Sequence, residues 1–138
     1  MVPKQSEIDH CLYDIKLWYK NNWPLCGFCG HLVRDNGDLA HLIRRSYSRE
    51  LQTNKLNLVL CHRHCHDIFD ESPEKAQYLP RMTEVMYIIY LLDKEYFNQL
   101  AEIMPELHPA FELFPDVRSD ISDIKHHGEL ITLQYLHK

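Results

Sequence analysis

Four of the five cysteines of this 138-residue chain lie in one window that is also rich in histidine. Cys26 and Cys29 form a C-x-x-C pair, and the run Cys61-His62-Arg63-His64-Cys65-His66 follows later. A C-x-x-C turn places two thiolates on one side of a tight knuckle, and a second pair of ligands completes a tetrahedral zinc site. The window therefore predicts a small core that is stapled by a structural Zn²⁺ ion.

The sequence leaves the second pair of zinc ligands open. Cys61 and Cys65 are separated by three residues, whereas His62 and Cys65, or Cys61 and His64, are separated by two. Thiolate and imidazole both suit zinc, so a site of three cysteines and one histidine is chemically ordinary. The alternative is a set of unmetallated thiols in a reduced core. Cys11, the remaining cysteine, is predicted to be a core thiol of the first helix.

Length and composition fit one domain over residues 1–138, because 45% apolar residues and 11% aromatics suffice for a buried core. No stretch reaches the ~18 uncharged apolar residues of a membrane-spanning helix. The N-terminal segment is polar and lacks the apolar region of a signal peptide. We therefore expect a cytoplasmic protein without a membrane partner, in which clustered cysteines bind metal more readily than they form disulfides.

Apolar residues at helical or strand spacing, and the turn residues between them, predict three regions: an N-terminal helix in 1–24, a zinc-stapled core in 25–72 and a helical extension in 73–138. The first helix is expected from a Ser6 cap to about Asn21. In the core we expect strands at 39–43 and 56–60 and a helix at 63–69. In the extension we expect a helix starting at 72–74 and helices at 83–92 and 93–104. The second of that pair is capped by Asp93, and a loop follows at 105–116. The tail at 119–138 is left open between helix and strand.

Charge is distributed unevenly along the chain, whose formal net charge is −5. This value argues against a protein that coats nucleic acid. Between positions 31 and 64, however, six basic residues face three acidic ones, whereas from position 71 onward twelve acids face six bases. A basic segment beside a metal site can hold a phosphate backbone. A mixed, solvated loop is an equally good interpretation of charge alone.

The stretch from Cys26 to Asp70 resembles the zinc-bearing branch of the HNH endonucleases, also called ββα-metal or His-Me finger nucleases. The resemblance covers about a third of the chain. It rests on Cys26-Gly27-Phe28-Cys29, Ala40-His41-Leu42-Ile43, Asn57 and Cys65-His66-Asp67-Ile68-Phe69-Asp70. It implies an α+β fold with a small, treble-clef-like ββα-metal core and flanking α-helices. In the family pattern the asparagine precedes one zinc ligand by five residues and the next by eight. That spacing favours His62 and Cys65, with Cys61 as the substitute for His62.

The resemblance implies a metal-dependent endonuclease that cuts or nicks DNA. A neutral histidine can deprotonate the attacking water, and His41 is the expected general base. Asn57 is expected to bond across the hairpin or to orient His41. His66 and Asp70, four residues apart on one helical face, are expected to hold a catalytic Mg²⁺ or another divalent ion, separate from the zinc. The basic residues expected near the scissile phosphate are Arg44, Arg45 and Arg63.

Other interpretations accompany this assignment. Many family members carry a metal ligand directly before the base, and here that position is Ala40. Asp38, two residues earlier, is an additional candidate ligand. Each residue also has an ordinary role: His41 as a strand histidine, Asn57 as a turn residue and His66 as a zinc ligand. The alternative function is a non-catalytic, zinc-stapled module that binds nucleic acid or protein. The C-terminal helices are a candidate surface for a protein partner, and the sequence does not indicate an oligomeric state.

Overall fold

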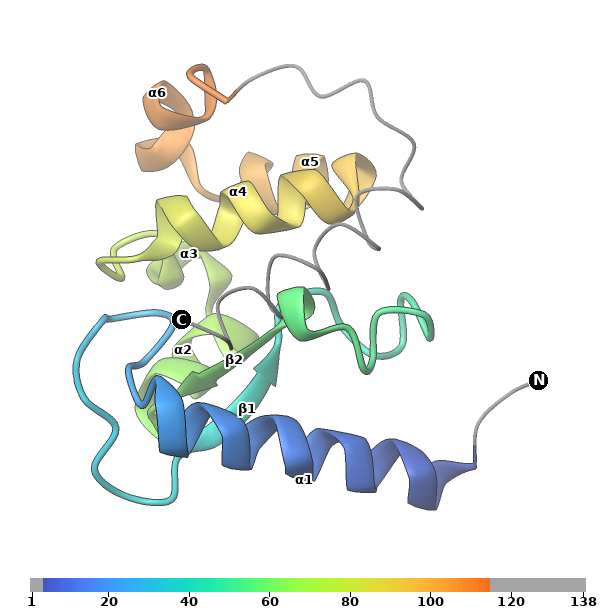
Figure 1. Cartoon of the computed structure of the whole chain (residues 1–138). Coiled ribbons are helices and arrows are strands. Elements are labelled where there is room, and N and C mark those ends of the chain that lie inside the picture. Colours follow the sequence, from blue (N-terminus) through green and yellow to red (C-terminus); the bar gives the residue numbers. More distant parts are fainter. Residues whose placement is uncertain (1–3, 115–138) are drawn as a thin grey trace.

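A computed structural model describes residues 4–114 and leaves out residues 1–3 and 115–138. In chain order the elements are α1 (Gln5–Asn22), β1 (Asp38–His41), the 3-10 helix η1 (Lys55–Asn57), β2 (Leu58–Cys61), α2 (Arg63–Glu71), α3 (Pro73–Ala76), α4 (Met82–Leu92), α5 (Lys94–Glu102), the 3-10 helix η2 (Pro105–Leu107) and α6 (His108–Phe111). The two strands form an antiparallel hairpin. Helices surround this small sheet (Figure 1), which confirms the prediction of an α+β fold at this level.

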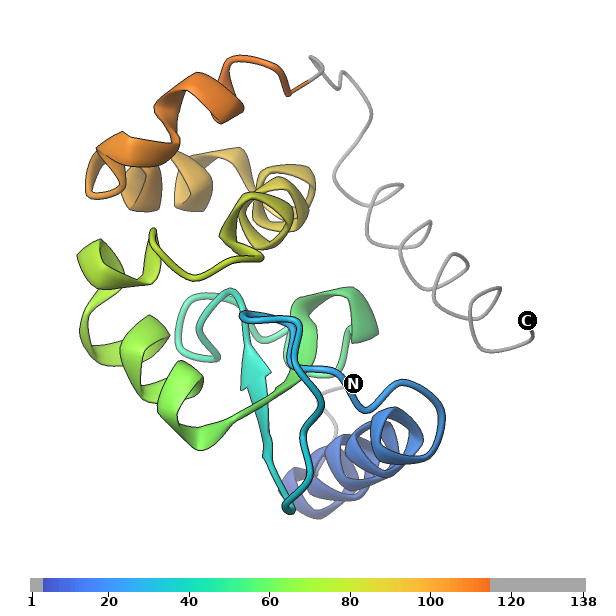
Figure 2. The same cartoon turned by 90° about the vertical axis from the view of Figure 1, so that its left-hand side faces the viewer.

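The β1–β2 hairpin lies between α1 on one side and the helices α3 to α6 on the other (Figures 1 and 2). Asp38 pairs with Cys61 at one end of the hairpin and His41 with Leu58 at the other. Ala40, Leu58 and Leu60 are buried, so the hairpin contributes directly to the hydrophobic core. His41 therefore stands at the end of a strand whose position is fixed by packing.

Helix α1 is fixed to the hairpin by its inner face. Ile15 is buried, and the Tyr19 hydroxyl donates a hydrogen bond of 2.8 Å to the backbone oxygen of Leu58 in β2. The helix begins at Gln5 after Lys4, and no side chain caps it, so the predicted Ser6 cap is wrong. Cys11 is half-buried and not a core thiol, because α1 packs on the molecule with one face only.

The C-terminal helices add an aromatic core above the hairpin. The Asp93 side chain accepts a hydrogen bond from the Tyr96 backbone N–H, so the predicted cap of α5 is confirmed.

The predicted loop at 105–116 is wrong for its first part, which forms η2 and α6. Proline is tolerated in the first turn of a helix, where its missing N–H needs no partner. The predictions for 119–138 lie outside the described residues.

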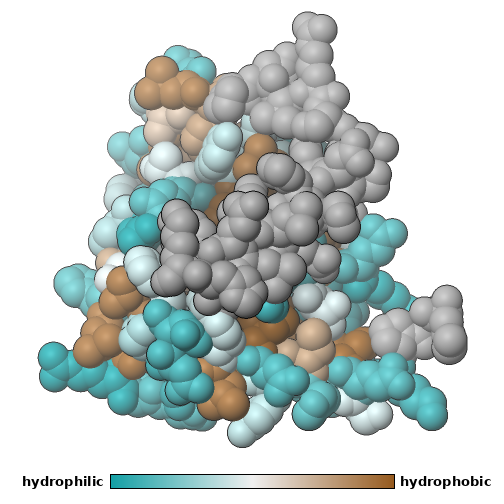
Figure 3. All heavy atoms as spheres, viewed as in Figure 1, coloured by the Kyte–Doolittle hydropathy of each residue, from teal (hydrophilic) through white to brown (hydrophobic). Residues whose placement is uncertain are grey.

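Apolar side chains gather on the surface at the end of the molecule that α6 occupies in Figure 1, as Figure 3 shows. Leu113, which follows α6, is 84% exposed. This is the surface to which the predicted protein partner would belong, and that partner stays a prediction. Among residues 4–114, no helix combines the length and the apolar composition that a membrane crossing requires.

Candidate functional site

Four side chains from the two ends of the cysteine-rich window converge on one point. The ligand atoms of Cys26, Cys29, His62 and Cys65 all lie within 4.8 Å of one another. Zinc bonds of about 2.0–2.3 Å in a tetrahedron would separate the ligand atoms by roughly 3.3–3.8 Å. The 3.3 Å between Cys29 Sγ and His62 Nδ1 fits this geometry. The cluster can therefore hold a structural metal ion such as zinc.

The backbone around the first cysteine pair is shaped to present sulfur. The Gly27 N–H donates to the Leu60 oxygen of β2 at 2.8 Å, which fastens the knuckle to the hairpin. A Cβ at Gly27 would lie 2.6 Å from the Val59 Cβ, so only glycine allows this approach. Gly30 has a φ of 82°, a conformation that L side chains rarely adopt. Both glycines therefore serve the metal knuckle.

Hydrogen bonds around the cluster favour the thiolate form of the first ligand. The backbone amides of Phe28 and Cys29 both approach Cys26 Sγ at 3.4 Å. Burial raises the pKa of Cys26, but hydrogen bonds from the backbone of Cys29, His62 and Phe28 outweigh it and lower the pKa to about 7. A thiol that ionises readily at neutral pH is suited to bind zinc.

His62, and not Cys61, completes the cluster. With Nδ1 facing the sulfurs, His62 Nε2 lies 3.1 Å from the Leu32 oxygen, and a hydrogen bond there fixes the ring orientation. Cys61 is fully buried, and its thiol donates to the backbone oxygen of Asp38 at 3.6 Å. Burial raises the pKa of Cys61, with neighbouring negative charges adding to the effect, so this thiol stays neutral.

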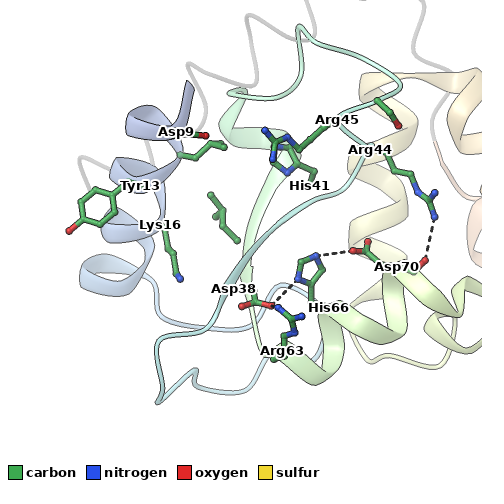
Figure 4. Close-up of a pocket in the computed structure, with 13 residues that line it drawn as sticks. Asp9, Tyr13, Lys16, Asp38, His41, Arg44, Arg45, Arg63, His66 and Asp70 are labelled. Carbon is green, nitrogen blue, oxygen red and sulfur yellow. Dashed lines mark hydrogen bonds and ion pairs between the residues drawn. The ribbon is translucent and has the colours of Figure 1, made fainter. Parts of the chain in front are cut away.

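A cleft of about 930 Å³ lies between α1, the hairpin and α2, and Figure 4 shows the residues that line it. It brings together residues that the sequence predicted to act on DNA: His41, His66, Asp70, Arg44, Arg45 and Arg63. The zinc-type cluster is a separate group of residues, none of which lines this cleft.

His41 is held by one ring nitrogen. Its Nε2 lies 2.9 Å from the Gln52 backbone oxygen, an acceptor only, so Nε2 carries the proton and Nδ1 is left with a lone pair. Burial lowers the pKa of His41; the hydrogen bond to Gln52 and the charge of Asp70 raise it, but burial and the charges of Arg45 and His66 outweigh them. The ring is therefore neutral at physiological pH and can accept a proton.

His66 lies between two carboxylates. Asp38 Oδ2 is 3.0 Å from its Nδ1, and Asp70 Oδ2 is 3.0 Å from its Nε2. Burial raises the pKa of Asp38, but the hydrogen bond from His66 and the charge of Arg63 lower it more, so this carboxylate is ionised. The Asp38 bond fixes the ring of His66, as carboxylates commonly do for metal-binding histidines.

The three arginines reach the cleft from two elements. Arg63 of α2 contacts Asp38 at 3.3 Å and Asp67 at 3.4 Å, and its side chain is 75% exposed. Arg44 donates to the Asp70 backbone oxygen at 3.3 Å, whereas Arg45 lies close enough to His41 for its charge to act on that ring (Figure 4). All three guanidinium groups remain accessible to an anionic ligand.

Asn57 lies outside the cleft, although it was predicted to be a catalytic residue. It is fully buried, and its side chain accepts from the Ile43 N–H at 2.7 Å and donates to the oxygens of Ile43 and Leu51 at 3.1 Å. Asn57 thus bonds across the hairpin, one of its two predicted roles, and pins the loop that carries Arg44 and Arg45. The orientation of His41 comes instead from Gln52.

Sequence reasoning missed several residues that line the cleft or hold its side chains. Gln52 acts through a backbone carbonyl, for which the side-chain pattern gives no signal. Asp38 was considered only as an auxiliary ligand, yet it is the partner of His66. Lys16 of α1 also lines the cleft, because the packing of α1 on the hairpin brings it there.

The expected divalent-ion site has only His66 and Asp70 as ligands. Within residues 4–114 the cysteine-histidine cluster is the one group of three or more converging metal ligands.

Comparisons of the chain with protein-family models, with curated proteins and with solved structures give no match.

Proposed function

We propose that the chain is a metal-dependent endonuclease of the HNH type, with a ββα-metal core, that hydrolyses phosphodiester bonds in DNA. The observation that carries this proposal is the shared cleft of His41, His66 and Asp70, which is lined by three accessible arginines. A base, a pair of oxygen and nitrogen ligands and a set of cations are what phosphodiester hydrolysis requires. The cysteine-histidine cluster serves as the structural zinc site that holds the hairpin and α2 together.

In this proposal His41 is the general base. Its Nε2–H bond to Gln52 leaves the Nδ1 lone pair to take a proton from the attacking water. The half-buried ring keeps the neutral form that this step needs. Fixing one nitrogen on a backbone carbonyl also limits rotation of the ring, so the base stays oriented toward its water.

His66 and Asp70 would hold the divalent ion, Mg²⁺ or another, and Asp38 would position His66. His66 Nε2 and Asp70 Oδ2 are 3.0 Å apart and lie on the same cleft. When bound, the ion supplies charge relief for the phosphoryl and leaving oxygens. Arg44, Arg45 and Arg63 would hold the phosphate while the oxyanion charge increases.

The competing function is a zinc-stapled module that binds DNA or protein without cutting it. Two observations favour this alternative. Ala40 occupies the position before His41 and is fully buried, and the expected ion site has two protein ligands only. Cleavage, measured directly, separates the two functions.

The test is incubation of zinc-loaded protein with supercoiled plasmid in the presence of Mg²⁺, Mn²⁺ or Ni²⁺. We expect nicked or linear plasmid with at least one of these ions and none with EDTA. His66→Ala should abolish the cleavage, whereas His64→Ala, which removes an exposed histidine of the same helix, should not. Plasmid binding without cleavage under all three ions would overturn the nuclease proposal and favour the binding module.

A further inference from the structure

Helix α1 forms one wall of the cleft, opposite the wall that carries the proposed catalytic groups. Figure 4 shows Asp9 and Lys16 of α1 on one side and His66, Arg63 and Asp70 on the other, whereas the ring of Tyr13 points outward from α1. Leu12 of α1 and Leu39 of β1 add an apolar lining. The segment that resembles the HNH endonucleases, residues 26–70, does not include this helix.

The α1 wall is part of the rigid fold. Ile15, one residue before Lys16, is buried, and the Tyr19 hydroxyl is bonded to Leu58 of β2. Burial raises the pKa of Tyr19 to about 12, so the hydroxyl remains a hydrogen-bond donor. Lys16 is therefore held over the cleft by a helix that is fixed at this end.

The charges of the cleft suit an anionic chain. Its formally charged lining groups are four bases (Lys16, Arg44, Arg45 and Arg63) and three acids (Asp9, Asp38 and Asp70), a balance of +1 in a chain of net charge −5. Two of the acids bond to His66, and Asp9 accepts a hydrogen bond from Gln5. Lys16 faces the cleft from the wall that has no other base.

We propose that α1 and α2 bound a groove for a single DNA strand and that Lys16 binds a backbone phosphate of that strand. This inference rests on the proposed function for the identity of the polymer. The volume of about 930 Å³ is in the range of pockets that enclose small ligands, a size that suits a few nucleotides of one strand, and the lining offers apolar surface for bases and cations for phosphates. The strand would then pass between Lys16 and the arginines, across His41 and His66.

The test measures binding of a labelled single-stranded oligonucleotide and of the matching duplex by fluorescence anisotropy at several salt concentrations. The protein carries His41→Ala, so that the substrate stays intact. We expect Lys16→Ala to weaken single-strand binding several-fold and to lower the salt slope by about 0.7, because one phosphate contact is lost. Lys20→Ala removes the same charge from the same helix outside the cleft and should leave binding unchanged.

The outcomes separate this inference from the nuclease proposal, because binding is measured without cleavage. Equal affinities for Lys16→Ala and Lys20→Ala would overturn the proposed role of Lys16 in strand binding and leave the nuclease proposal untouched. Dependence on Lys16 with the duplex alone would overturn the single-strand groove. Lys16-dependent single-strand binding, together with a wild-type protein that fails to cleave DNA with Mg²⁺, Mn²⁺ or Ni²⁺, would support the groove and overturn the nuclease proposal.

Discussion

At the scale of single residues, the two rings His41 and His62 owe their chemistry to backbone carbonyls. His41 Nε2 faces the Gln52 oxygen, and His62 Nε2 faces the Leu32 oxygen. In each ring Nε2 donates a hydrogen bond, so Nδ1 keeps the lone pair, which can accept a proton in His41 and bind a metal ion in His62. The tautomer of a histidine thus follows from the fold around it more than from its sequence neighbours.

The choice between Cys61 and His62 as the third zinc ligand can be tested by substitution. We expect His62→Ala to lose most of its zinc, because it removes one of four converging ligands. Cys61→Ala should retain about one zinc per chain, since that thiol bonds to Asp38 and lies outside the cluster. Metal analysis of the purified variants measures both. Zinc loss in Cys61→Ala with retention in His62→Ala would reverse the assignment.

Under the proposed mechanism, the pH dependence of cleavage would report on His41. A general base acts when neutral, so the rate should rise with pH through the pKa of His41. Burial lowers this pKa, and the charge of Arg45 contributes. The midpoint of this rise in the pH–rate profile should therefore lie below the ordinary histidine pKa of about 6.5. Arg45→Ala should move the midpoint toward higher pH. Single-turnover rates at saturating DNA measure it, and a midpoint that does not move in Arg45→Ala would contradict this origin of the shift.

At the scale of elements, the cleft depends on how the loop between β1 and β2 is closed. Asn57 makes three hydrogen bonds to the backbone of Ile43 and Leu51, and all of them are buried. These bonds satisfy polar groups that water cannot reach. Loop residues Arg44, Arg45 and Gln52 reach the cleft or His41 because this closure places them there.

Asn57→Ala should destabilise the protein by about 3 kcal/mol, because it leaves buried N–H and C=O groups without partners. Asn22→Ala removes an exposed side-chain bond to Trp18 and should change stability by less than about 0.5 kcal/mol. Denaturant unfolding of the zinc-loaded variants measures both values. A loss for Asn57→Ala as small as that for Asn22→Ala would show that the loop does not depend on these bonds.

The sequence predicted the elements whose signals are local. The helix start at Asp93 follows from a side chain that caps its own helix, and the C-x-x-C knuckle follows from ligand spacing. The predicted loop at 105–116 failed because a proline signal is compatible with both a loop and a first helical turn. Asp38, Gln52 and Lys16 gained their roles only through packing between distant elements, which no single window of sequence contains.

At the scale of the whole molecule, the cysteine-histidine cluster joins the C-x-x-C knuckle to the start of α2, where the Gly27–Leu60 hydrogen bond and the stacked rings of Phe28 and Phe69 also connect the knuckle to the rest of the core. Cys26 and Cys29 precede the hairpin, whereas His62 and Cys65 begin α2, and the hairpin itself has two strands of four residues. An isolated two-stranded hairpin is marginally stable in water. We therefore infer that bound zinc supplies a substantial part of the folding free energy of the core.

Removal of zinc should destabilise the entire described fold. With a strong chelator we expect the thermal midpoint to fall by more than about 15 °C, because several kcal/mol of metal-linked folding energy are lost. Re-addition of Zn²⁺ should restore the original midpoint, whereas Mg²⁺ should not, since thiolate ligands select the softer ion. Circular dichroism melts measure this. Coincident melts with and without chelator would contradict a structural role for the metal.

The most direct test of the account is the single-turnover cleavage rate of a labelled DNA by wild-type protein and by His41→Ala, at equal zinc content. We expect the wild type to cleave in the presence of a divalent ion and His41→Ala to lose at least ~100-fold in rate with an unchanged thermal midpoint. His64→Ala should cleave like the wild type. Equal rates for His41→Ala and the wild type would contradict the nuclease proposal, because the proposed general base would then take no part in the reaction.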